Sequence, residues 1–324
     1  MTSIFKSAAH AFHALAGNPR TIAADKAHGD ELKAQLDQLT SALPPGLPVM
    51  ASRRWQATPV GRDTFIVASP LRRDAVDFAQ ACLRHDIRRV VDLRSAKEKE
   101  DGPLNPLDGA VKRVEIGPLT ADFDRLGRPV PLQGLDARPT AGDAHVRLVE
   151  VRVSRDHTAL GPDGEPRPGH AQPLSLIRMP IGDQREISAN RLLQTSVHLV
   201  RAEARDGGKT VFQCADGGHA AATFAVAREL LQGFLRGDIQ ERHVDNAILM
   251  QCMRMSRDHR PGVFRAEDLA ALTAFARKMF EADRRGELQG LPRPAALVPP
   301  PKPARRPAPL PRSSLASTGG QTDA

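Results

Sequence analysis

The sequence KTVFQCADGGHAAATF, residues 209–224, decides the expected fold of this chain. Val211 and Phe212 predict a short buried strand that ends at Cys214, and residues 220–232 are rich in helix-forming side chains. A glycine-containing turn separates the two elements. Backbone N–H groups at the start of such a helix favour anions and stabilise a thiolate. The stretch therefore predicts a strand, a phosphate-binding loop with a cysteine nucleophile, and a helix.

The same stretch resembles the active-site loop of cysteine-based protein tyrosine phosphatases, in which five residues separate the cysteine from an arginine that is followed by Ser or Thr. Gly217 falls where the family has its glycine. Ala220 stands at the arginine position, Ala221 at the Ser/Thr position and Gln213 at the position of the preceding histidine, so the loop is degenerate. The resemblance implies that Cys214 is the nucleophile. It assigns phosphate binding to Ala215, Asp216, Gly217, Gly218, His219 and Ala220.

Other segments extend the resemblance in the correct order along the chain. Residues 65–71 resemble the strand that opens the family's core, and residues 87–93 resemble the next strand. Residues 257–267 follow the segment ahead of the family's last helix. The family places there a glutamine that positions the hydrolytic water, and this chain has Arg265. Arg265 is therefore a candidate catalytic residue that could replace the lost guanidinium, and His219 is a second source of positive charge in the loop.

The family's general-acid loop, Trp-Pro-Asp, maps to residues 179–183. Pro180 fits this pattern, but Ile181 occupies the acid position and Asp183 lies two residues later. The resemblance makes Asp183 the candidate catalytic acid. The alternative is a turn residue or a helix cap, because Gly-Asp is common turn chemistry.

A second branch of the superfamily leaves the ligand class open. Residues 91–94, Val-Asp-Leu-Arg, and residues 222–224, Ala-Thr-Phe, are similar to bacterial tyrosine-phosphatase-like inositol phosphate phosphatases. The implied partner is a phosphorylated protein, with a host protein as one target, or an inositol phosphate. No cofactor or metal is expected, because three widely separated cysteines form neither a disulfide framework nor a zinc site.

Strand and helix patterns alternate along the middle of the chain, which predicts an α/β fold with a mixed, mainly parallel sheet flanked by helices. We expect a leader of the secretion type at residues 1–48, a tyrosine-phosphatase-like domain at 49–288 with a loop-rich insertion at 98–173, and a disordered Pro-rich tail at 289–324. A dispensable helix and a mitochondrial-type presequence are alternatives for the leader. The resemblance favours a leader for bacterial type III secretion.

The net charge of +8 is spread thinly, without a basic stripe that contains aromatic residues, so nucleic-acid binding is not expected. No apolar run is long enough to span a bilayer. The compositional bias suggests a bacterial source, which by analogy predicts a bacterial cytoplasmic protein that is exported into a host cell.

Three functions remain open at this stage. Loss of an arginine fork would remove ~4–7 kcal/mol of transition-state stabilisation, by analogy with arginine fingers. The first reading is thus a pseudophosphatase that binds phosphorylated ligands without cleaving them. The second is an active phosphatase that uses a Cys214 thiolate on phosphotyrosine or inositol phosphates, and the third is a non-catalytic interaction scaffold.

Overall fold

The structure, a computed structural model, describes residues 19–41, 57–60, 63–100, 105–109, 112–117, 119–132, 144–155, 170–179, 187–258 and 262–293. Its helices are α2 (Pro19–Ser41), α3 (Ala75–Arg84), α4 (Ala96–Glu100), α5 (Ala189–Asp206), α6 (His219–Arg236), α7 (Val244–Asp258) and α8 (Ala266–Arg284). Its strands are β1 (Ala57–Val60), β2 (Thr64–Ala68), β3 (Ile87–Asp92), β4 (Arg113–Ile116), β5 (Leu119–Pro131), β6 (His145–Arg155), β7 (His170–Arg178) and β8 (Lys209–Cys214). Single 3-10 turns lie at Arg72–Asp74, Pro106–Asp108 and Glu241–His243.

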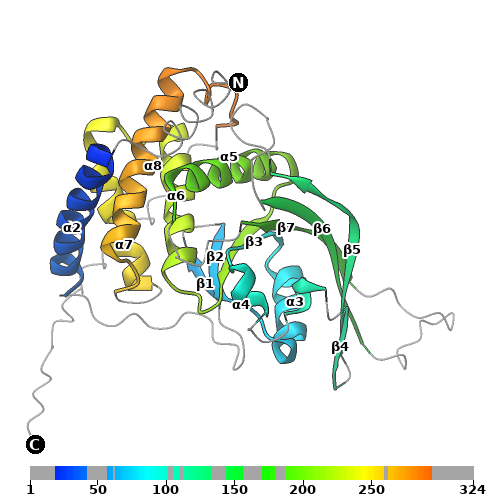
Figure 1. Ribbon diagram of the computed structural model, residues 1–324. Coiled ribbons are helices and arrows are strands. Elements are labelled where there is room, and N and C mark those ends of the chain that lie inside the picture. Colours follow the sequence, from blue (N-terminus) through cyan, green and yellow to red (C-terminus); the bar gives the residue numbers. More distant parts are fainter. Residues whose placement is uncertain are drawn as a thin grey trace, which may run out of the picture. The chain divides into compact units, whose positions relative to one another are not determined.

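The strands form one eight-stranded sheet in the order β1-β2-β8-β3-β7-β6-β5-β4 (Figure 1). The four central strands, β2, β8, β3 and β7, run parallel. Antiparallel pairs flank them, with β1 at one edge and β6, β5 and β4 at the other. The predicted α/β fold with a central mixed sheet between helices is confirmed. The parallel strands form the centre of the sheet. The carboxyl ends of β2, β8, β3 and β7 therefore lie side by side at the same end of these strands.

Helices cover both faces of the sheet, and the sequence of β8 shows why. Successive side chains of a strand point to opposite faces. Phe212 packs in the larger apolar core together with Phe224 of α6, whereas Val211 packs in the second core together with Phe78 of α3. Helices α5, α6, α7 and α8 contribute to the first core, and α3 covers the other face. A continuous apolar strand is therefore buried from both sides.

Helix α2 belongs to the compact unit Met1–Pro294, although the sequence placed it in a leader at residues 1–48. It lies beside α7 and α8 (Figure 1). Its side chains Leu32 and Leu36 are buried in the main core, and Arg277 of α8 donates two hydrogen bonds to Asp25, at 2.6 and 2.7 Å. Residues 19–41 thus pack with the main core, and the division at residue 48 with a leader before it stays a prediction. Residues 1–18 lie outside the described residues.

The predicted loop-rich insertion at 98–173 supplies β4, β5 and β6, which continue the sheet as antiparallel hairpins. The disordered tail at 289–324 stays a prediction, although Leu291, within its first residues, is buried in the main core. Residues 294–324 lie outside the described residues.

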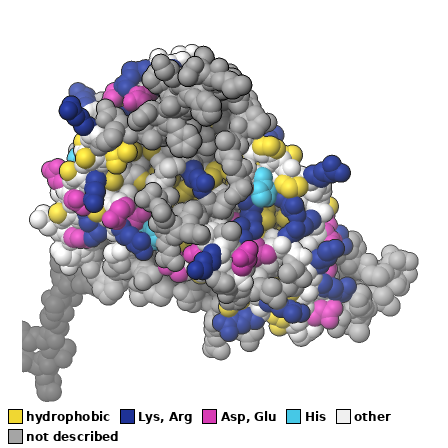
Figure 2. Space-filling view, viewed as in Figure 1, with side chains coloured by type: hydrophobic (Ala, Val, Ile, Leu, Met, Phe, Trp, Pro, Cys, Tyr) yellow, Lys and Arg dark blue, Asp and Glu magenta, His cyan; other side chains and the backbone are white. Residues whose placement is uncertain are grey.

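The described residues contain no helix that could cross a membrane. They also contain no cluster of side chains suited to hold a metal ion. On the face of the molecule shown in Figure 2, Lys and Arg side chains are scattered together with Asp and Glu side chains.

Candidate functional site

Cys214 ends β8 at the centre of the parallel part of the sheet. The Ser69 N–H, just after β2, donates to the Cys214 carbonyl at 2.9 Å, and the Leu93 N–H, just after β3, donates to the Gln213 carbonyl at 2.9 Å. Gly218 is the N-cap of α6, which starts at His219. The structure therefore confirms the strand, loop and helix that residues 209–224 predict.

Two glycines allow the loop to turn tightly against the neighbouring strand. Gly217 has a φ of +65°, and a Cβ at this position would lie 2.7 Å from the backbone nitrogen of Ala68. A Cβ on Gly218 would lie 2.7 Å from the carboxylate of Asp216. A side chain at 217 would both strain the backbone and displace the loop from β2.

The thiol of Cys214 lies under the N-terminus of α6. The Gly218 N–H donates to the sulfur at 3.1 Å, and the Ala221 N–H donates to it as well. The same Gly218 N–H also donates to Oδ1 of Asp216 at 2.8 Å, and the thiol donates to this oxygen at 3.5 Å. The carboxylate of Asp216 thus shares the loop's donors with the sulfur.

The thiolate that the sequence predicts is not favoured in the structure. Cys214 is only 6% exposed, and burial raises the pKa of its thiol from 9.0 to about 12. The N–H groups of Ala221 and Gly218 act to lower this pKa, but they do not offset burial, and the nearby charge of Asp216 raises it further. The resemblance placed an arginine at position 220, where this chain has alanine, so the loop itself supplies no guanidinium to stabilise the anion. Cys214 is a neutral thiol at physiological pH.

Asp216 is the anion of this loop. Its burial acts to raise the pKa of the carboxyl group, but the Gly218 N–H, the Cys214 thiol and the charge of His219 outweigh burial and lower the pKa. The residue as a whole is exposed at the surface. The loop therefore carries a carboxylate beside its sulfur.

The ring of His219 is engaged by an acidic side chain outside the loop. Its Nδ1 lies 3.1 Å from Oδ1 of Asp268, and both side chains are largely buried. The other oxygen of Asp268 accepts a hydrogen bond from the backbone N–H of Arg265 at 2.8 Å. His219 thus ties the first turn of α6 to the first turn of α8.

Of the remaining predicted site residues, the structure describes Arg265, Ala220 and Ala215. Arg265 is the N-cap of α8 and its side chain is exposed. Within the part of the chain that the structure describes, no hydrogen bond joins its guanidinium to the loop. Ala220 is buried in the main core, and Ala215 is exposed. Asp183, the predicted acid, lies outside the described residues, as do residues 180–186 in general.

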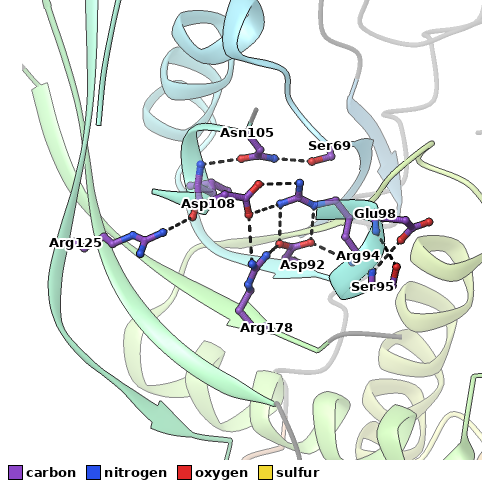
Figure 3. A network of polar contacts seen from close by, with 10 residues as sticks. Ser69, Asp92, Arg94, Ser95, Glu98, Asn105, Asp108, Arg125 and Arg178 are labelled. Carbon is purple, nitrogen blue, oxygen red and sulfur yellow. Dashed lines mark hydrogen bonds and ion pairs between the residues drawn. The ribbon is translucent and has the colours of Figure 1, made fainter. Parts of the chain in front are cut away.

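Figure 3 shows a polar network at the carboxyl end of β3. The sequence did not identify this network as part of the site. Arg94 donates to both oxygens of Asp92, each at 3.0 Å, and to both oxygens of Asp108, at 3.0 and 2.8 Å. Arg178, at the end of β7, pairs with the same two aspartates. Burial lowers the pKa of Arg178 to about 10. Since each guanidinium is matched by carboxylates, this network does not supply the missing cation.

The sequence carried a partial signal for the network. Asp92 and Arg94 stand two residues apart at the end of a predicted strand, within the Val-Asp-Leu-Arg motif. Asp108 reaches them from the 3-10 turn Pro106–Asp108, 14 residues after Arg94, and Arg178 meets them through the pairing of β3 with β7. No local pattern announces the contact between His219 and Asp268, which are separated by 49 residues.

No protein-family model matches this sequence. No curated protein matches it either. Similar solved structures include PTPN18 in complex with HER2-pY1196 phosphopeptides, with a TM-score of 0.49 and 11% identity over 70% of this chain and 71% of that chain. A second PTPN18 structure, from work on distinct HER2 tyrosine phosphorylation sites, has a TM-score of 0.48 and 10% identity over 70% and 72% of the two chains.

Proposed function

We propose that this protein is a phosphatase-like protein that binds a phosphorylated ligand weakly at the Cys214 loop and does not hydrolyse it. The observation that carries the proposal is the neutral, buried thiol of Cys214 beside the carboxylate of Asp216. Phosphoryl transfer by a cysteine needs a thiolate as nucleophile. It also needs positive charge on the equatorial oxygens of the phosphoryl group.

This loop lacks both requirements. With a pKa of about 12, roughly one thiol in 40,000 is ionised at pH 7.4. Ala220 offers a methyl group in place of a guanidinium fork, and His219 is engaged by Asp268. By analogy with arginine fingers, the missing guanidinium removes ~4–7 kcal/mol of transition-state stabilisation. Turnover then falls by several orders of magnitude.

Binding is supported by what the loop keeps. The Gly218 N–H points at the sulfur, and α6 is a helix of 18 residues whose N-terminus favours negative charge. The ligand class, phosphorylated protein or inositol phosphate, is part of the proposal, and so is export of the protein into a host cell as an effector.

Hydrolysis of p-nitrophenyl phosphate by the full chain tests the proposal, with Cys214→Ser as the blank. We expect the two rates to be indistinguishable from pH 5 to pH 8. A wild-type rate clearly above that of the serine variant would establish the active-phosphatase alternative. Binding of phosphate or a phosphotyrosine peptide, measured by calorimetry, separates the proposal from the scaffold alternative, which predicts no binding.

A further inference from the structure

We propose that Arg125, Arg147 and Arg178 form a binding site for a phosphate dianion or the phosphate group of a monoester, away from the Cys214 loop. The three arginines lie on the neighbouring strands β5, β6 and β7. Strand β6 is three strands away from β8, which is about 14 Å at the usual spacing between strands. The proposed site is therefore a second one, and it does not depend on the function proposed for the Cys214 loop.

The register of the sheet places the three arginines on one face. Arg125 lies opposite Val149, and Arg147 lies opposite Leu176. Side chains two residues apart on a strand share a face. Arg147 therefore shares a face with Val149 and Arg125. Arg178, in turn, shares a face with Leu176. Since Val149 and Leu176 belong to the core on the α3 side, the arginines form a diagonal row at the border of this core.

Two guanidinium groups of this row have no carboxylate partner among the described residues. Figure 3 shows that Arg178 and its neighbour Arg94 are balanced by two aspartates. Arg125 donates to the backbone carbonyl of Leu107, at 3.3 Å, which carries no net charge. Arg147 makes no hydrogen bond or ion pair within the described parts of the chain, and its Nε is buried. The row thus has an excess of two positive charges.

The two unbalanced groups also oppose each other. Burial and the charge of Arg147 lower the pKa of Arg125, whereas the charge of Asp108 acts to raise it. Arginine stays charged at neutral pH, so this repulsion and the buried, unpartnered Nε disfavour the folded state. A phosphate dianion relieves both, because its two charges match the excess and its oxygens accept from guanidinium forks.

A ligand can reach the row, and Arg125 is already held in position. Arg125 is exposed, Arg147 is partly buried and the side chain of Arg178 is 15% exposed. The guanidinium of Arg125 fills the space that a side chain on Gly109 would occupy, and Gly109 directly follows the 3-10 turn Pro106–Asp108. Figure 3 shows Arg125 and Arg178 reaching this turn from β5 and β7. The turn therefore fixes both ends of the row before a ligand binds.

Phenylglyoxal footprinting of the full chain at pH 8 tests the site, because this reagent modifies guanidinium groups that no ligand covers. Modification of each arginine is followed by mass spectrometry in inorganic phosphate, phosphoserine or succinate at equal ionic strength. The first two probes separate free phosphate from a phosphorylated protein side chain as the source of the ligand. Succinate is the dicarboxylate control, and the exposed Arg257, which is paired with Asp258, reports effects outside the site.

Calorimetry compares the wild type with Arg147→Met for the same probes. Arg152→Met is the matched control, because Arg152 lies on the same strand, faces the opposite side of the sheet and is paired with Glu150. Arg147→Lys keeps the charge but removes the fork, and it should bind more weakly than wild type and more tightly than Arg147→Met. Melting temperatures verify that each variant is folded.

At about ten times its Kd, phosphate or phosphoserine should slow the modification of Arg125 and Arg147 about tenfold and leave Arg257 unchanged. Arg147→Met should lose this protection at Arg125 and bind one phosphate fewer per chain, whereas Arg152→Met should match wild type. Unchanged modification of Arg125 and Arg147, equal protection by succinate, or phosphate binding that survives Arg147→Met would each overturn the site. None of these outcomes would affect the proposal for the Cys214 loop.

Discussion

Alkylation of Cys214 as a function of pH tests the central electrostatic feature of the site. Wild-type protein is treated with iodoacetamide between pH 6 and pH 10, and modification of the peptide that contains Cys214 is followed by mass spectrometry. The reagent attacks the thiolate, so the rate reports the ionised fraction. With a pKa of about 12, the rate should rise close to tenfold for each pH unit across this range, without a plateau.

The magnitude follows from burial. A thiol with the ordinary pKa of 9.0 is ionised in about one molecule in 40 at pH 7.4, whereas a thiol with a pKa of about 12 is ionised in about one in 40,000. The expected rate is therefore about a thousandfold below that of a simple thiol, and restricted access lowers it further. This difference in pKa corresponds to about 4 kcal/mol.

The same difference has a defined sign for stability. The folded protein holds the thiol proton more tightly than the unfolded chain does. Cys214 therefore contributes stability that is present below pH 9 and is lost progressively as the pH rises from 9 toward 12.

The shape of the pH profile, and not the absolute rate, decides the outcome, because burial by itself slows the reagent. Protein unfolded in urea is the control and should show an inflection close to pH 9. An inflection below pH 7 in the folded protein would refute the reasoning. It would show that Cys214 is a thiolate at neutral pH, and the active-phosphatase alternative would then lead.

Three further predictions concern stability and are measured by urea denaturation. Arg228→Met leaves the partly buried Glu203 and Glu229 without their guanidinium partner and should lower the free energy of unfolding by about 3–5 kcal/mol. Arg257→Met breaks only an exposed ion pair and should lower it by less than about 1 kcal/mol, so equal losses would contradict this. Gln213→Leu removes a fully buried amide whose nitrogen and oxygen have no hydrogen-bond partner among the described residues, so stability should stay level or rise by up to about 1–3 kcal/mol. Gln172→Leu, the matched change, removes an amide that donates to two backbone carbonyls and should be destabilising by about 1–3 kcal/mol; the reverse order would be inconsistent with the burial of unpaired amide groups. Gly29→Ala places a Cβ 2.6 Å from the Ala266 carbonyl oxygen and should lower stability by about 1–3 kcal/mol despite the better helix propensity of alanine; a gain in stability would show that α2 is not closely packed.

The elements around the loop were predictable because their signals are local. The apolar run at Val211 and Phe212 specifies a strand, since side chains on both faces must be buried, and the alanine-rich sequence after Gly218 specifies a helix. Gly217 adopts a positive φ. A glycine in a tight turn between a strand and a helix is typical of this backbone conformation. The order of strands and helices then indicates a sheet covered on both faces.

The α2 helix and the β4–β6 hairpins were placed less well. Residues 19–41 have a weak helical pattern, and it is the tertiary contacts, of Leu32 and Leu36 with the main core and of Asp25 with Arg277, that make this helix part of the unit. The hairpins contain many charged residues, and their place in the sheet depends on pairing with β7, which is remote in sequence.

The sequence by itself determined where the thiol stands, at the end of a central strand and below a helix, because strand and helix formation depend on neighbouring residues. It also determined that the loop has no arginine at position 220. The ionisation state of Cys214 was decided only by the tertiary structure, because desolvation depends on the packing of every element around the sulfur. The same holds for the roles of Asp216 and His219, since a side chain's partner is set by its position in space and not by its neighbours in the chain.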